Sequence, residues 1–184
     1  LMVLPVVLYG HPVLKKVGEN IDSSYPDLGN IITNMWETMY FAKGVGLAAP
    51  QIGLSIRLFI IDTTPYYEDK KVNKGLKKIF INPEIIDESG ALWAFEEGCL
   101  SIPNIHADVE RTTHVKLSYL DENFNEHIEV FDEMNARVIQ HEYDHIQGVL
   151  FIEKINPLRR QLLQRKLEKL KKGIHSAKYP VKSA

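Results

Sequence analysis

The chain has 184 residues, of which 45% are hydrophobic and 25% are charged, and its formal net charge is −2. This composition predicts one globular domain with a hydrophobic core and excludes a disordered or fibrous chain. No run of about 18 apolar residues occurs, so a membrane-spanning helix is not expected. The single cysteine, Cys99, has no partner for an intramolecular disulfide and favours a reducing compartment.

The charge is distributed unevenly along the chain. Residues 154–184 contain ten lysines and arginines against one acid, a balance of +9, so residues 1–153 carry −11 of the total of −2. Such asymmetry suggests a basic contact surface near the C-terminus. The apolar segment Met2–Leu8 lacks the basic start and the cleavage site of a signal peptide. We interpret Leu1 as an addition to the natural start.

The first helix is expected after Ser23–Pro26, where a serine is a candidate cap and a proline suits the first turn. Apolar residues then recur at helical spacing and predict an amphipathic helix that packs on the core and ends at Gly44. These residues are Leu28, Ile31, Ile32, Met35 and Met39.

The next segment, Gly44–Gly53, is rich in glycine and alanine and too broken for a helix. Small residues allow another backbone to come close, so this segment can form a wall that receives an extended peptide, with Gln51 as its polar contact. A simple connector remains the alternative interpretation. A phosphate-binding loop is excluded because no Lys-Ser/Thr pair follows.

The middle of the chain predicts mostly β-structure. Three short strands are expected from branched and apolar residues: Ile56–Ile61, Ile79–Ile81 and Ala91–Phe95. The polar segment Thr63–Lys78 between the first two is expected to be a surface loop. Alternating apolar and polar residues over Val109–Leu120 and Glu126–Phe131 predict a hairpin.

The most informative stretch is Gln140–His145, with the sequence QHEYDH. Histidines four residues apart lie one helical turn apart on the same face, so His141 and His145 can bind one metal ion. Glu142 can then reach a water on that metal and act as a general base, as in other H-E-x-x-H motifs. A charged, exposed helix face that happens to carry two histidines is the alternative.

The same helix carries other candidates. Asp132 is expected to cap it and Gly148 to end it. Met134 and Val138 share the face of the two histidines and make an apolar surface next to the metal.

Cys99 lies in a predicted loop, Glu96–Pro103, after two acids and a glycine. A lone cysteine is often a small buried hydrophobic residue, and this interpretation stays open for the loop alone. Together with His141 and His145, however, Cys99 makes a ligand set that suits Fe(II) or Zn(II). Three protein ligands and a water in the fourth position is a catalytic arrangement, whereas four protein ligands would be structural.

Asn156-Pro157 is expected to open a final helix that extends to about residue 172, with a frayed tail over 173–184. Leucines are expected on one face of it and basic residues on the other. These leucines are Leu158, Leu162, Leu163, Leu167 and Leu170. The simplest interpretation is a capping helix with a solvated charged side, and a docking element is the alternative.

Three segments together resemble the motifs of the peptide deformylase family: Gly44–Gln51, Glu97–Ser101 and Gln140–His145. The resemblance runs from the N-terminal Leu4-Pro5 to the C-terminal helix. It implies a single catalytic domain over residues 2–184 with an α+β fold, in which antiparallel sheets surround the metal-bearing helix and a C-terminal helix follows.

This resemblance also implies a function. The enzyme would be cytoplasmic and would remove the formyl group from the N-terminal formyl-methionine of newly made polypeptides. One ferrous ion per chain is implied, which zinc, nickel or cobalt can replace. No DNA or membrane partner is implied. The basic C-terminal helix resembles one that contacts the ribosome, and its charge suits RNA phosphates.

Residue chemistry assigns the roles in such a reaction. Glu142 takes a proton from the metal-bound water and later passes it to the leaving amine. The side-chain amide of Gln51 and the backbone N–H of Leu100 are expected to stabilise the oxygen of the formyl group as it gains charge. The resemblance implies that Glu97 and Arg111 pair behind the site and fix the loop of Cys99.

The substrate contacts are also predicted. Gly46 is expected to contact the peptide backbone, in strand-like pairing with the segment around it. Met134 and Val138 are candidates for the pocket that takes the methionine side chain.

Two other functions are possible for this ligand set. A zinc endopeptidase would need a third ligand downstream, where only Glu168 and His175 are available, and Cys99 fits better. A non-catalytic module that binds nascent chains or ribosomes would use the metal structurally. It would then need a fourth protein ligand in place of water.

Overall fold

The computed structural model describes residues 2–71 and 74–184, so Leu1, interpreted as an addition, lies outside the described residues. The α-helices are α1 (Leu28–Phe41), α2 (Glu133–Ile146) and α3 (Pro157–Lys171). The strands are β1 (Val6–Val7), β2 (Gly46–Ala48), β3 (Leu58–Asp62), β4 (Lys77–Cys99), β5 (Ile102–Leu120), β6 (Glu126–Asp132) and β7 (Val181–Lys182). In the described part of the chain, no helix is both long enough and apolar enough to span a bilayer.

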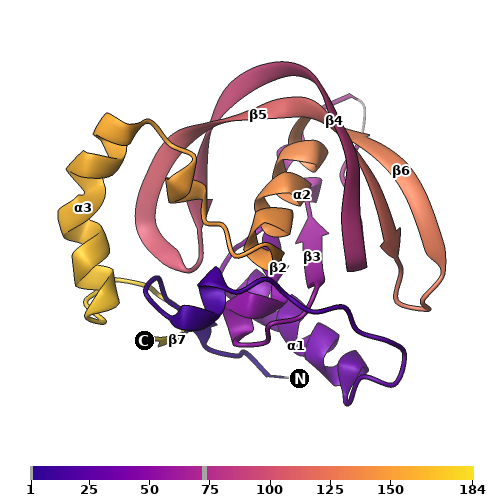
Figure 1. The fold of residues 1–184 in the computed structure, drawn as a ribbon, viewed down its shortest axis with the longest axis horizontal. Coiled ribbons are helices and arrows are strands. Elements are labelled where there is room, and N and C mark those ends of the chain that lie inside the picture. The colour runs from indigo at the N-terminus through magenta and orange to yellow at the C-terminus, as the bar shows by residue number, and fades with distance from the viewer. Residues whose placement is uncertain (1, 72–73) are drawn as a thin grey trace.

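A five-stranded antiparallel sheet in the order β2-β3-β4-β5-β6 wraps around α2. The long strands β4 and β5 curve over this central helix, as Figure 1 shows. The apolar side chains of α2, such as Ile139 and Ile146, are buried against Phe59 of β3 and Phe80 of β4. The predicted fold class, a central helix surrounded by antiparallel sheet, is therefore confirmed.

Strand β4 corrects the prediction of two separate strands at 79–81 and 91–95. Both lie in one strand of 23 residues that continues through Asn82-Pro83. The register with β5 shifts between Ile81 and Glu84, and Asn82 has a φ of 49°. A bulge at this point tolerates the missing N–H of Pro83, so the proline bends the strand instead of ending it.

The start of α1 was predicted wrongly. The residue before the helix is Asp27, which has a φ of 60° and makes no side-chain capping bond, so neither Ser23 nor Ser24 caps it. The apolar face is confirmed by Met35 and Met39, which are fully buried. The loop expected after β3 includes one helical turn at Thr64–Tyr66, while its residues 72–73 lie outside the described part.

Helix α2 begins directly after Asp132, as expected, although the aspartate side chain makes no capping bond. The helix ends at Ile146, and Gly148 follows with a φ of 74°. A Cβ atom there would lie 2.6 Å from the carbonyl oxygen of Lys15, so only glycine fits this turn.

Helix α3 is capped by Asn156, whose side chain accepts a hydrogen bond from the backbone N–H of Leu158 (2.9 Å). The expected leucine face is only partly buried. Leu163, Leu167 and Leu170 pack on the core, whereas Leu158 and Leu162 are 72% and 75% exposed. The helix lies at one side of the molecule in Figure 1. It packs on the core through these three buried leucines only.

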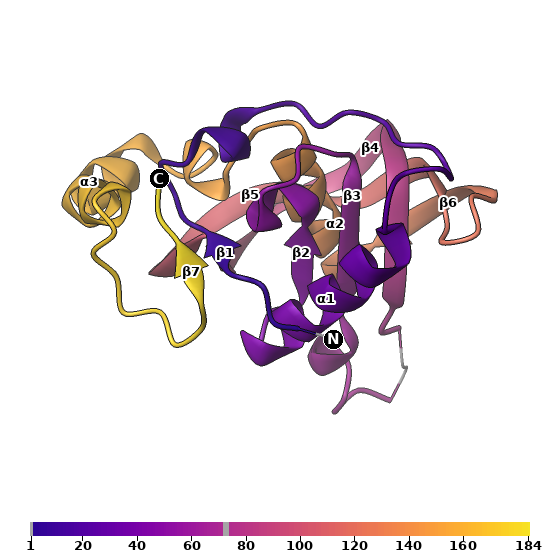
Figure 2. The same cartoon turned by 90° about the horizontal axis from the view of Figure 1, so that it is seen from below.

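The tail after α3 is not frayed as predicted. Its strand β7 pairs in parallel with β1, with Val6 opposite Val181, and the two strands lie side by side in Figure 2. The N–H of Val6 donates to the carbonyl of Pro180 (3.0 Å), and that of Leu8 donates to the carbonyl of Lys182 (2.9 Å). Backbone hydrogen bonds therefore join the N-terminal and C-terminal segments of the chain.

Candidate metal centre and active site

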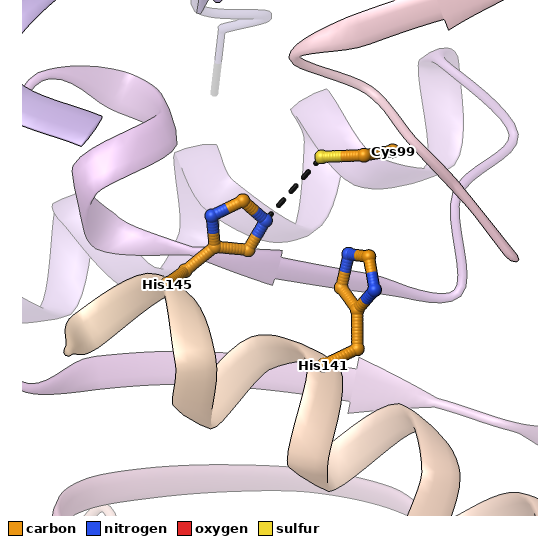
Figure 3. A group of neighbouring side chains, drawn as sticks. All are labelled: Cys99, His141 and His145. Carbon is orange, nitrogen blue, oxygen red and sulfur yellow. Dashed lines mark hydrogen bonds between the residues drawn. The ribbon is translucent and has the colours of Figure 1, made fainter. Parts of the chain in front are cut away.

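Three side chains from two distant elements converge at the centre of the molecule. Cys99 is the last residue of β4, while His141 and His145 lie one turn apart on α2 (Figure 3). One donor atom from each lies within 4.8 Å of the others, and Sγ of Cys99 is 3.3 Å from Nε2 of His145. The structure thus brings together the three residues that the sequence predicted as metal ligands.

This donor set fits a divalent first-row metal ion. A thiolate and two imidazoles are the ligands that zinc and iron accept, and three donors leave a position for a further ligand. Burial lowers the pKa of His145 well below its ordinary value, assisted by the charges of His141 and Arg111, which favours the neutral ring that coordinates metals.

The charge around His141 also favours a cation. Burial lowers the pKa of His141, but the Cys99 and Glu97 side chains and the charge of Glu142 outweigh it and raise that pKa well above the ordinary value. The surroundings of His141 therefore favour a positive charge beside the Cys99 thiol. A bound metal ion would supply this charge in place of the proton on the ring.

A buried ionic network holds His141 from behind. Oε1 of Glu97 is 2.9 Å from Nδ1 of His141, and its carboxylate also accepts from Arg111 (2.7 and 3.0 Å) and from Arg137 (2.5 Å). Arg111 in turn donates to Asp144 (2.9 Å). Burial works to raise the pKa of Glu97, but its bonds to His141 and Arg111 lower that pKa far below its usual range. An ionised carboxylate at this point fixes the orientation of the imidazole.

The network contains one expected pair and one missed residue. The pairing of Glu97 with Arg111 is as predicted, whereas Arg137 did not appear among the candidates. A usable signal existed, because Arg137 lies four residues before His141 and so one turn away on the same face of α2.

Glu142 lies in the interior beside the metal ligands and is only 4% exposed. Its Oε1 has no hydrogen-bond partner in the described structure, and burial raises the pKa of the carboxyl to about 7. A carboxyl with this pKa can both take and release a proton at neutral pH.

Gly46 faces this carboxyl. A Cβ atom at Gly46 would come within 2.5 Å of Oε2 of Glu142. Gly46 is predicted to contact a peptide backbone. The structure adds a second reason for a glycine at this position, because a larger side chain would take the space of Glu142.

The predicted oxyanion donors lie next to Cys99. Gln51 is 2% exposed; its Oε1 accepts from the N–H of Ala48 (3.0 Å), and its Nε2 donates to Oγ of Ser101 (3.1 Å) and Sγ of Cys99 (3.5 Å). Leu100 follows Cys99 in the turn between β4 and β5. Ser101, which holds the Gln51 amide, was part of the recognised motif but had no predicted role.

A cleft of about 670 Å³ gives access to Cys99, His141 and Glu142. Gly46, Gln51 and Leu100 line it, and so do the two residues proposed for a methionine pocket, Met134 and Val138. The segment Ser176–Tyr179 of the C-terminal tail also lines the cleft, which the sequence did not suggest.

Comparison with known proteins gives a consistent result. Residues 3–161 match the family model described as polypeptide deformylase. A peptide deformylase of Christiangramia forsetii is 50% identical over 188 residues, which cover 98% of this chain and 96% of that protein. A peptide deformylase from Flavobacterium johnsoniae is 52% identical over 190 residues, which cover 100% of this chain and 97% of that protein.

Solved structures of peptide deformylases are also similar to this chain. The crystal structure of a peptide deformylase from Legionella pneumophila has a TM-score of 0.80 and 36% identity, covering 92% of this chain and 96% of that one. The structure from Synechococcus elongatus has a TM-score of 0.79 and 37% identity, covering 97% and 92%.

Proposed function

We propose a mechanism for this chain from the premise that it belongs to the peptide deformylase family, whose members are enzymes that remove N-terminal formyl groups. The substrate is the formyl-methionine end of a newly made polypeptide, and the products are formate and a free amine. The observation that carries the mechanism is the position of the buried Glu142 carboxyl next to three convergent metal-ligating side chains.

Cys99, His141 and His145 would hold one metal ion. From the family resemblance we assign Fe(II) as the native metal, with Zn(II), Ni(II) or Co(II) as possible substitutes. A thiolate with two imidazoles suits all these ions. When bound, the ion supplies a Lewis acid and lowers the pKa of a water molecule toward neutrality.

Glu142 moves the protons. It takes a proton from the water as the water oxygen adds to the formyl carbon. It then gives that proton to the amine nitrogen as the carbon–nitrogen bond breaks and formate leaves. A carboxyl with a pKa of about 7 is suited to both transfers.

Gln51 and Leu100 stabilise the formyl oxygen while it carries negative charge. The amide of Gln51 lies 3.5 Å from the thiol of Cys99, and the N–H of Leu100 belongs to the peptide bond that follows Cys99. Removing one donor of this kind costs about 3 kcal/mol of transition-state stabilisation in other enzymes.

The peptide lies in the cleft along Gly44–Gly46. Strand β2, which includes Gly46, stands at the edge of the sheet, so a peptide can extend the sheet by strand-like pairing. The methionine side chain enters between Met134 and Val138, which are apolar and line the same cleft as Glu142.

The enzyme would work in the cytoplasm, where the thiol of Cys99 stays reduced. The basic residues of α3, among them Arg159, Arg165 and Lys166, are exposed and would contact ribosomal RNA phosphates. Co-sedimentation with ribosomes that decreases as salt rises would support this contact, and salt-independent co-sedimentation would contradict it.

The proposed activity is tested with two blocked peptides. Protein purified without oxygen is incubated with formyl-Met-Ala-Ser and with acetyl-Met-Ala-Ser, and the free amine is measured. We expect amine and formate from the formyl peptide only. Cleavage at an internal bond of the acetyl peptide, without formate release, would instead favour an endopeptidase.

A further inference from the structure

The C-terminal tail returns to the active-site cleft after α3. Residues 176–179 line the cleft. Strand β7 then pairs with β1, and Figure 2 shows the two strands side by side. Oγ of Ser176 accepts a hydrogen bond from Nδ2 of Asn104 (2.6 Å), which fastens the tail to β5. The tail is therefore a wall of the catalytic cleft.

Tyr179 connects this wall to the turn that follows the metal ligand Cys99. Its hydroxyl donates a hydrogen bond of 2.6 Å to the carbonyl oxygen of Leu100. Cys99 pairs with Ile102, so Leu100 and Ser101 form the two-residue turn of the β4–β5 hairpin. The carbonyl that accepts from Tyr179 belongs to the central peptide of this turn.

The turn lacks the backbone conformation that two-residue hairpin turns favour. Two-residue hairpin turns favour conformations in which at least one turn residue has a positive φ. Neither Leu100 nor Ser101 is among the described residues with a positive φ. Other segments hold both backbone carbonyls of the turn: the Tyr179 hydroxyl donates to that of Leu100, and the N–H of Tyr9 donates to that of Ser101 (2.9 Å).

The turn contacts Gln51 through the side chain of Ser101. Oγ of Ser101 accepts from Nε2 of Gln51 (3.1 Å), and the same nitrogen lies 3.5 Å from Sγ of Cys99. A rotation of the central peptide would move Ser101, so Gln51 would keep its bond to Ala48 but lose the hydroxyl partner that orients its Nε2.

We infer that Tyr179 is a positioning residue for deformylation: its hydroxyl holds the Leu100–Ser101 turn in the conformation that aims Gln51 at the formyl group. This inference rests on the proposed function of Gln51. It gives the C-terminal tail a part in turnover and not only in stability.

The test compares Tyr179→Phe with a matched control, Tyr25→Phe. Tyr25 is a half-buried tyrosine that packs against the core cluster beneath α1, and it does not line the cleft. The Tyr179 variant keeps its ring and loses one hydrogen bond, so we expect kcat on formyl-Met-Ala-Ser to fall about three- to tenfold, with KM changed less than twofold. The control should match the parent protein.

A second readout does not depend on activity. The amide resonance of Ser101, whose peptide bond contains the accepting carbonyl, should shift in the ¹⁵N–¹H spectrum of Tyr179→Phe and not in that of Tyr25→Phe. The measurement is made on metal-free and on zinc-loaded protein, and the shift is expected in both.

The outcomes separate this inference from the proposed function. If the parent protein releases no formate, the proposed function fails, and the Ser101 resonance still decides whether Tyr179 holds the turn. If the parent is active, an unchanged kcat in Tyr179→Phe overturns the inference, even if thermal stability falls. A lower kcat with an unmoved Ser101 resonance also overturns it.

Discussion

Gly46 and Glu142 are in direct contact at the centre of the cleft, where a Cβ atom on the glycine would lie 2.5 Å from Oε2 of the glutamate. The Gly46→Ala change must therefore displace the carboxyl that we propose as the proton carrier. A displacement of about 1 Å can cost about 10²-fold in rate, so we expect kcat to fall by about that factor with metal content unchanged. The formyl-peptide assay and metal analysis measure the two effects.

The matched control is Gly29→Ala, because a Cβ atom at Gly29 meets nothing within 4 Å. Gly29 lies in α1, where alanine also favours the helix. Full activity in both variants would show that the space at Gly46 is not needed for the position of Glu142.

Glu142 itself is tested by Glu142→Gln. This change keeps the size of the side chain and replaces the carboxylate, which can accept a proton, with an amide, which cannot. We expect the metal to be retained and turnover to fall about 10²- to 10⁴-fold, the usual contribution of a general acid–base group. Exposed Glu37 in α1 supplies the control Glu37→Gln. Normal turnover in Glu142→Gln would remove this residue from the mechanism.

The buried network around Glu97 makes a prediction about stability and metal affinity together. Glu97→Gln leaves buried Arg137 without its carboxylate partner and leaves Arg111 with Asp144 alone, and breaking a buried pair costs about 3–5 kcal/mol. The His141 ring also loses its orienting partner, so metal affinity should fall about 10- to 100-fold. Urea unfolding and metal titration measure the two effects.

The control for that experiment is Glu110→Gln, since Glu110 is exposed on β5. We expect it to change the unfolding free energy by less than about 0.5 kcal/mol. A Glu97 variant as stable as this control would mean that the network contributes nothing to the fold.

Asp62 gives a prediction about pH. Burial acts to raise its pKa, but hydrogen bonds from Thr64 and Tyr40 outweigh burial and lower it below the ordinary value. A carboxyl with a lowered folded-state pKa stabilises the fold above its unfolded-state pKa, and this contribution disappears as pH falls through the folded-state value. Asp62→Asn should therefore cost about 1 kcal/mol at pH 7.

The difference in unfolding free energy between Asp62→Asn and the parent protein should shrink progressively as pH decreases below about 4, the ordinary pKa of aspartate. Unfolding by urea at a series of pH values measures it, with the exposed Asp87→Asn as control. A difference that stays constant down to the acid limit would show that the charge of Asp62 is not responsible.

The parts of the site that local periodicity controls could be predicted from the sequence. The helical repeat places His141 and His145 on one face and puts Glu142 beside them, and the structure has this arrangement. The convergence of Cys99 on this face could not be derived from spacing, because 41 residues, mostly of β5 and β6, separate Cys99 from His141. Cys99 was predicted as the third ligand from the chemistry of the ligand set, and the family resemblance supported that prediction.

The parts that depend on tertiary pairing were missed. Strand β7 has two residues and is formed by hydrogen bonds to β1 at the opposite end of the chain, so no local pattern marks it. The continuation of β4 through Pro83 depends on a bulge against β5, and local propensity alone favoured a break. The missed pairing of β7 with β1 also concealed the approach of Tyr179 to the cleft.

The most direct test of the metal centre is X-ray absorption spectroscopy of the protein loaded with one equivalent of zinc. The expected first shell has one sulfur at about 2.3 Å and two imidazole nitrogens at about 2.0–2.1 Å, with one further light-atom ligand from solvent. In Cys99→Ser the sulfur contribution should disappear. A shell without sulfur in the parent protein, or one filled by four protein ligands, would contradict the account.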